Sequence, residues 1–156
     1  MRLQNILLTA LLVTGMATLS TLQAQEKKIK REQLPPAVEK TVAEESKGAT
    51  IRGFATEIED GKRLYEAELV VNGHGKDISM DEQGNIMEIE EEVSMDSLPS
   101  AVKDGLMKAA GSGTISKVES LTKKGNLVAY EAVVKTGTKR REIQVGPDGK
   151  KLAHPQ

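Results

Sequence analysis

The chain has 156 residues, with 22 basic and 23 acidic side chains, no cysteine, no tryptophan and only three aromatic residues. The missing cysteines exclude a disulfide framework, a thiol nucleophile, cysteine-ligated zinc or iron–sulfur centres and a lipid anchor on cysteine. The two histidines, His74 and His154, are too few for most histidine-based metal or catalytic sets, so we predict no resident metal and no cofactor.

The first 24 residues have the order of a secretory signal peptide. Arg2 is followed by an apolar run from Ile6 to Val13, and the segment ends at the small residue Ala24. A membrane anchor needs ~20 mostly apolar residues, whereas Thr, Ser and Gly interrupt this stretch. We therefore predict cleavage after Ala24, no stable membrane anchor afterwards, and a periplasmic or secreted protein.

Comparison of the chain with itself indicates two similar copies. The segment 34–38 (LPPAV) matches 98–102 (LPSAV), and 65–67 matches 130–132, where both copies read Tyr-Glu-Ala. Further landmarks follow in the same order at an offset of 64 or 65 residues. We expect a charged linker at 25–33, one repeat at 34–93 and a second repeat at 94–156.

Each copy is predicted to begin with a helix, because a proline stands near its start and apolar residues recur at helical spacing. Gly48 and Gly111 are expected to end the two helices. Alternating strands separated by short glycine turns follow, which is typical of antiparallel hairpins. The expected fold is α+β: two tandem repeats, each with one helix packed on an antiparallel meander of three to four strands, docked into one compact body.

These landmarks resemble a known family. A proline-started helix is followed by Gly48-Ala49-Thr50-Ile51, then by Tyr-Glu-Ala on the second strand of a hairpin, then by an Asp-x-x-Gly-x-Ile segment at 81–86. This order resembles two PepSY-like domains in tandem, an arrangement also described as β-lactamase-inhibitor-like. The resemblance implies an exported, non-enzymatic module that binds proteins or inhibits peptidases, and it carries no catalytic motif.

Charge is distributed unevenly between the segments. Residues 25–33 carry four basic and two acidic side chains, 34–93 carry six and fifteen, and 94–156 carry eleven and six. The near-neutral total is therefore a cancellation between an acidic first repeat and a basic second one. Opposite charges of this kind favour salt-sensitive self-association.

Six charged residues are candidates for partner contact. Glu88, Glu90 and Glu92 alternate along one strand and could serve Ca²⁺, which prefers several carboxylates. Alternate residues on a strand lie about 6.6–7 Å apart, too far for all three to bind one ion unaided, so a solvated acidic face is the favoured interpretation. The basic counterpart is the run Lys139, Arg140 and Arg141, which is either a contact for an acidic partner or a solvated strand start.

The sequence therefore favours a binding protein over an enzyme. Ser112 lies between two glycines without the context of a catalytic nucleophile, and an exported chain with three aromatics and no net positive charge is not expected to bind nucleic acid. We predict an exported binding module with an unidentified protein partner, an inhibitor or regulator of a secreted or envelope protein such as a peptidase. The alternative is an envelope protein that binds a divalent cation or small ligand through the acidic first repeat.

Overall fold

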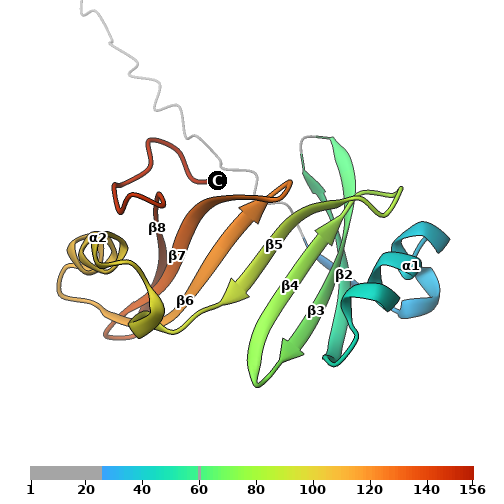
Figure 1. Ribbon diagram of the computed structural model, residues 1–156, viewed down its shortest axis with the longest axis horizontal. Helices are drawn as coiled ribbons and strands as arrows, with labels where there is room; N and C mark the ends of the chain where they lie inside the picture. The colour runs from blue at the N-terminus through green and yellow to red at the C-terminus, as the bar shows by residue number, and fades with distance from the viewer. Residues whose placement is uncertain (1–25, 60) are drawn as a thin grey trace, which may run out of the picture.

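The computed structural model describes residues 26–59 and 61–156, and the predicted export segment, residues 1–24, lies outside them. Eight strands in the described residues form one antiparallel sheet in which each strand pairs with its neighbours in chain order (Figure 1). The strands are β1 (Lys27–Ile29), β2 (Thr50–Glu59), β3 (Lys62–Val71), β4 (His74–Met80), β5 (Ile86–Glu92), β6 (Thr114–Lys123), β7 (Asn126–Thr136) and β8 (Lys139–Val145).

Two α-helices in the same residues interrupt the meander, α1 (Pro36–Glu45) before β2 and α2 (Ser100–Ala110) before β6. Both follow the predicted pattern, with a proline at the start of each, where a missing N–H costs no helical hydrogen bond. Gly111 ends α2 with a φ of 62°, a conformation that glycine adopts without strain. A single 3₁₀ turn precedes each helix, at Arg31–Gln33 and at Met95–Ser97.

The predicted architecture of two helix-plus-meander repeats is wrong. The chain is mostly β, and its strands form a single sheet. The two halves are joined because β5 pairs with β6 over five residue pairs, which include Glu90 opposite Leu121. Alternation within a strand predicts that the strand is paired but not which strand pairs with it. Had the sheet ended at β5, a row of backbone donors and acceptors would have been left unpaired, and β6 supplies their partners.

Both helices pack on the same face of this sheet, each over its own apolar cluster. Val38 and Val42 of α1 contact a cluster drawn from β2, β3 and β4, and Val102 and Leu106 of α2 contact a second one drawn from β6, β7 and β8. The buried strand residues are Phe54, Tyr65, Ala67, Leu69, Ile78 and Met80 in the first cluster and Val118, Ala132 and Val145 in the second. Burial of these side chains fixes which face of every strand points away from the helices.

The backbone of a turn lies directly against α2. Gly149 has a φ of 76°, and a Cβ atom built on Gly105 in the helix would collide with the Gly149 carbonyl group. Gly105 weakens the helix by ~1 kcal/mol relative to alanine, and this close approach explains why glycine stands there.

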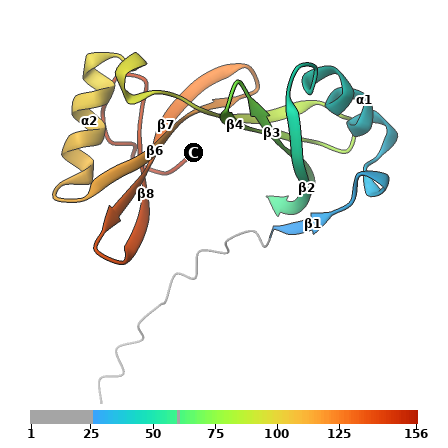
Figure 2. The ribbon, with the colours of Figure 1, turned by 90° about the horizontal axis from the view of Figure 1, so that it is seen from below.

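The sheet curves around its uncovered face. Figures 1 and 2 show α1 and α2 at opposite ends of the sheet, both on its outer side, with the strands arched between them. In the described part of the chain no helix covers the inner face. None of the helices described in residues 26–59 and 61–156 combines the length and apolar character needed to cross a membrane.

Candidate functional site

Acidic residues line the inner face in rows that run across the strands. In one row Glu68 lies opposite Asp77, which lies opposite Glu90. In the next row Glu119 lies between Glu92 and Glu131. Directly opposed residues on antiparallel strands point to the same face, so each row brings like charges together, which destabilises a sheet in the absence of counter-charge.

A cavity of about 560 Å³, which we call the acidic hollow, lies on this face, and the residues that line it include Glu66, Asp77, Glu90, Glu119 and Glu131. The residues described around it are all polar; nine are acidic and two, Lys117 and Arg140, are basic. In each strand, alternate residues pack under the helices, and the residues between them point to the inner face. The alternation that builds the core therefore also places the side chains that line the hollow.

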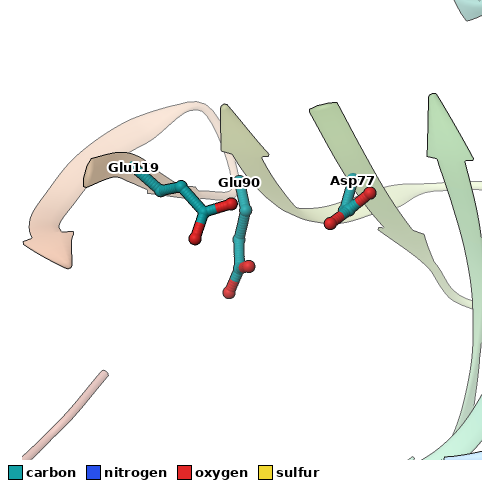
Figure 3. Close-up of side chains that lie close together, drawn as sticks. All are labelled: Asp77, Glu90 and Glu119. Carbon is teal, nitrogen blue, oxygen red and sulfur yellow. The ribbon is translucent and has the colours of Figure 1, made fainter. Parts of the chain in front are cut away.

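Three carboxyl groups converge at the middle of the acidic hollow. Asp77, Glu90 and Glu119 come from β4, β5 and β6, and each offers an oxygen within 4.8 Å of the others. Figure 3 shows the three side chains projecting to the same side of the sheet. Glu119 is only 5% exposed and forms an ion pair with Lys117. Three carboxylates at this spacing have the chemistry that a hard divalent cation prefers.

Burial and crowding raise the pKa values of the carboxyls in the acidic hollow. The pKa of Glu90 is raised to about 8, first by burial and then by the charges of Glu119 and Glu88. The pKa of Glu66 is raised to about 7 by burial and by Asp77. Burial likewise raises the pKa of Asp77. Near neutral pH the hollow therefore holds protons that ordinary surface carboxyls have lost.

The predicted acidic trio does not act as one group. Of its three members only Glu90 joins the central carboxyls. Glu88 forms an ion pair with Lys123 at 2.9 Å, and Glu92 accepts a hydrogen bond from the backbone N–H of Gly75 at 3.1 Å. Asp77 lies directly opposite Glu90 on the neighbouring strand, and strands are spaced about 4.8 Å apart, whereas alternate residues on the strand of Glu90 are about 6.6–7 Å away.

The predicted basic run is divided between the two faces of β8. Arg140 lines the acidic hollow, 3.8 Å from Glu142. Arg141 points to the helix side, where its Nη2 donates to the carbonyls of Ala109 and Ala110 at 3.0 and 2.8 Å and so caps the end of α2. Lys139 is exposed at the β7–β8 turn.

Sequence reasoning missed Asp77 and Glu119, and it treated the Tyr-Glu-Ala segments as fold residues only. In each segment the tyrosine and alanine face the core, whereas Glu66 and Glu131 line the acidic hollow. The alternation of each strand indicates that these glutamates point away from the core. Only the register between strands shows that they lie close together.

A second cavity, of about 530 Å³, lies beside β8. Its walls include Ala109 from the end of α2, Ile143, and the C-terminal residues Leu152, Ala153 and Pro155. The C-terminal segment is held to β8 by the N–H of Gln156, which donates to the Gln144 side chain at 2.8 Å. This cavity therefore depends on the position of the chain end, whereas the acidic hollow is lined mainly by paired strands, with Glu26 and Gln156 added from outside them.

Several solved structures share this fold. A BLIP-like protein from Bacteroides fragilis is 22% identical, with a TM-score of 0.55 over 74% of this chain and 81% of that one. A DUF2874 family protein from Bacteroides ovatus is 20% identical, with a TM-score of 0.60 over 76% and 84% of the two chains. A protein from Bacteroides eggerthii, provisionally described as periplasmic, is 18% identical, with a TM-score of 0.62 over 76% and 86%. The chain therefore has a BLIP-like fold, and the PepSY-like label stays a prediction.

No protein-family model matches the chain, and no curated protein sequence matches it.

Proposed function

We propose that the chain is an exported, non-enzymatic binding protein that receives a partner protein on the inner face of its sheet. The observation that carries the proposal is the acidic hollow, a polar cavity of about 560 Å³ on a curved sheet face that the described helices leave open. The signal-like first 24 residues and a neighbour in fold that is provisionally described as periplasmic support the exported location.

The character of the partner follows from the charge of the face. Nine acidic against two basic side chains around the hollow attract a positively charged surface and repel an acidic one. The BLIP-like neighbour supports the narrower proposal that the partner is an exported enzyme, such as a peptidase, whose activity the chain inhibits or regulates.

Capture from an envelope fraction tests the proposal when it is combined with matched variants. The variant Glu66→Gln/Asp77→Asn/Glu90→Gln neutralises the hollow, and Glu44→Gln/Glu82→Gln/Asp104→Asn neutralises three exposed acids outside it. We expect the wild type and the control to enrich the same protein and the hollow variant to lose it. Enrichment that is unchanged in the hollow variant would refute a role for this face.

A second candidate function is favoured by one specific observation, the convergence of Asp77, Glu90 and Glu119. We propose as the alternative that these carboxyls bind a divalent cation, with water completing the six to eight oxygen ligands that Ca²⁺ takes. This proposal replaces the predicted use of the first repeat alone, because Glu119 lies on β6.

Calorimetry with Ca²⁺ at pH above 8 tests the alternative, because the carboxyls are then ionised. Binding heat should vanish in Asp77→Asn and Glu119→Gln. It should persist in Glu92→Gln, because the Glu92 carboxylate accepts a hydrogen bond from the Gly75 backbone N–H instead. The absence of heat at millimolar Ca²⁺ would exclude the cation and leave the protein partner as the proposal.

A further inference from the structure

The turn between β7 and β8 carries a concentrated positive charge that we call the basic tip, residues 135–140. All six residues are exposed, and three of them, Lys135, Lys139 and Arg140, are cationic while none is acidic. Lys135 lies directly opposite Arg140. Like charges opposed across two strands destabilise the pair.

Acidic residues of the same molecule offset this repulsion only weakly. Among the described residues Arg140 has one ion pair, at 3.8 Å to Glu142, with both side chains more than half exposed. An exposed pair of this length stabilises by at most about 1 kcal/mol. The tip therefore presents cations without strong acidic partners.

The acidic hollow, in turn, has few basic residues to neutralise its carboxylates. Its central carboxyls, Asp77, Glu90 and Glu119, come from three neighbouring strands, and each offers an oxygen within 4.8 Å of the others. Among the described residues, the ion pair in this group is that of Glu119 with Lys117. The basic tip and the acidic hollow are each repulsive alone and attractive together.

We propose that a second copy of the chain docks its basic tip into the acidic hollow, and that the exchange is mutual. Arg140 already lies at the wall of its own hollow, whereas Lys135 and Lys139 are not among the described residues that line it. The rest of the tip cannot fold over that hollow, because β7 and β8 are paired along their length and continue the sheet whose face forms it. Two copies related by a two-fold axis each give a tip and receive one. Such an exchange closes into a dimer rather than an open chain.

The size of the inner face fits this occupant. Seven strands, β2 to β8, spaced about 4.8 Å apart and 7 to 11 residues long, span a face of roughly 29 by 23–36 Å, on the order of 800 Å². A standard stable interface buries about 800 Å² per partner. The curvature of the sheet lets the projecting edge of one copy enter the concave side of the other (Figure 2).

The dimer and the proposed function rest on different observations but use the same face of the sheet. A partner protein would have to compete with the second copy for the acidic hollow. The dimer would therefore hold the hollow closed at high protein concentration and low salt.

Sedimentation velocity of the chain from residue 25 onward, which contains every described element, tests the inference. We expect a concentration-dependent dimer at about 50 mM salt and a monomer at about 500 mM, where charge interactions are screened within a few ångströms. The tip variant Lys135→Glu/Lys139→Glu, which spares Arg140 because that residue lines the hollow, should weaken dimerisation at least about tenfold. The control Lys40→Glu/Lys108→Glu makes the same charge change at exposed positions of the two helices, and it should dimerise like the wild type.

A charge-exchange experiment distinguishes docking of the tip into the hollow from nonspecific attraction between opposite charges. Glu26→Lys/Glu57→Lys/Glu142→Lys reverses acids around the hollow, and this variant should be monomeric alone but pair with the tip variant. It should not pair equally with the helix control. A wild type that stays monomeric at low salt, or a tip variant that dimerises as tightly as the wild type, would overturn the inference. Either result leaves the capture of a different protein, and so the proposed function, open to its own test.

Discussion

Asp77 and Glu90 lie directly opposite each other on β4 and β5, with both carboxyl groups on the inner face of the sheet. Opposed like charges destabilise a sheet, and burial raises the pKa of each of these carboxyls. The apolar clusters on the other face hold the strands in this register despite the repulsion. The inner face is thus arranged to gain free energy from any positively charged ligand.

Stability is predicted to fall as pH rises from about 5 to about 8.5. The folded chain keeps protons on Glu66 and Glu90 up to pKa values of about 7 and about 8, whereas the unfolded chain releases them near the ordinary value of 4.5. The folded state therefore binds more protons throughout this interval, and unfolding becomes easier as they are lost. Thermal unfolding across the pH range measures the effect.

Glu66→Gln/Glu90→Gln provides the control for this pH dependence. Neutral amides remove the two titrations, so the melting temperature of the variant should change less with pH and should exceed that of the wild type at pH 8.5. A wild-type melting temperature that rises between pH 5 and 8.5 would contradict the assignment.

Gly105→Ala is predicted to destabilise the protein, by about 1–3 kcal/mol. Helix propensity alone predicts a gain of ~1 kcal/mol, but the added methyl group would meet the carbonyl of Gly149 and push the turn off the helix. Lys108→Ala, at an exposed position of α2, should leave stability nearly unchanged. Urea unfolding distinguishes the two, and a stabilised Gly105→Ala would show that the turn yields freely.

The two adjacent arginines of β8 are predicted to differ in their effect on stability. Arg141→Gln should lose about 1–2 kcal/mol, since its guanidinium donates to two carbonyls at the end of α2. Arg140→Gln should change stability by less than about 0.5 kcal/mol, because its ion pair is long and exposed. Equal losses in the two variants, measured by denaturant unfolding, would argue against the cap.

The continuous sheet predicts one unfolding transition for both ends of the molecule. Leu69→Ala removes buried side-chain volume under α1, and Leu106→Ala does so in α2. Each should cost about 2–5 kcal/mol and shift the same single calorimetric peak, because pairing of β5 with β6 joins the two clusters. Two separate peaks, each responding to one substitution, would contradict this coupling.

The local elements of this fold are readable from sequence, whereas its assembly is not. Helical spacing in 34–42 and 98–109 and alternation around Tyr65 and Tyr130 predict helices and strands that the structure contains. These patterns reflect contacts close in sequence. The pairing of β5 with β6 depends on backbone hydrogen bonds that leave no residue pattern, and so the predicted architecture of two docked helix-plus-meander repeats was wrong.

The same limit applies to the site. Alternation placed Glu88, Glu90 and Glu92 on one face, which is necessary for a cluster but does not bring them within reach of each other. The residues that do converge on Glu90 are Asp77 and Glu119, brought there by register across two strand pairs. Spacing along the chain carries no information about that register.

Site-specific photo-crosslinking in cells that export the protein determines whether the inner face is the binding surface. A photoreactive residue at position 79 replaces Ser79, which lines the acidic hollow, and a matched one replaces Asp104, which is exposed on α2. If partners bind the inner face, we expect a discrete crosslinked species from position 79 and none from position 104. Crosslinking from position 104 alone would contradict it and assign binding to the helix face.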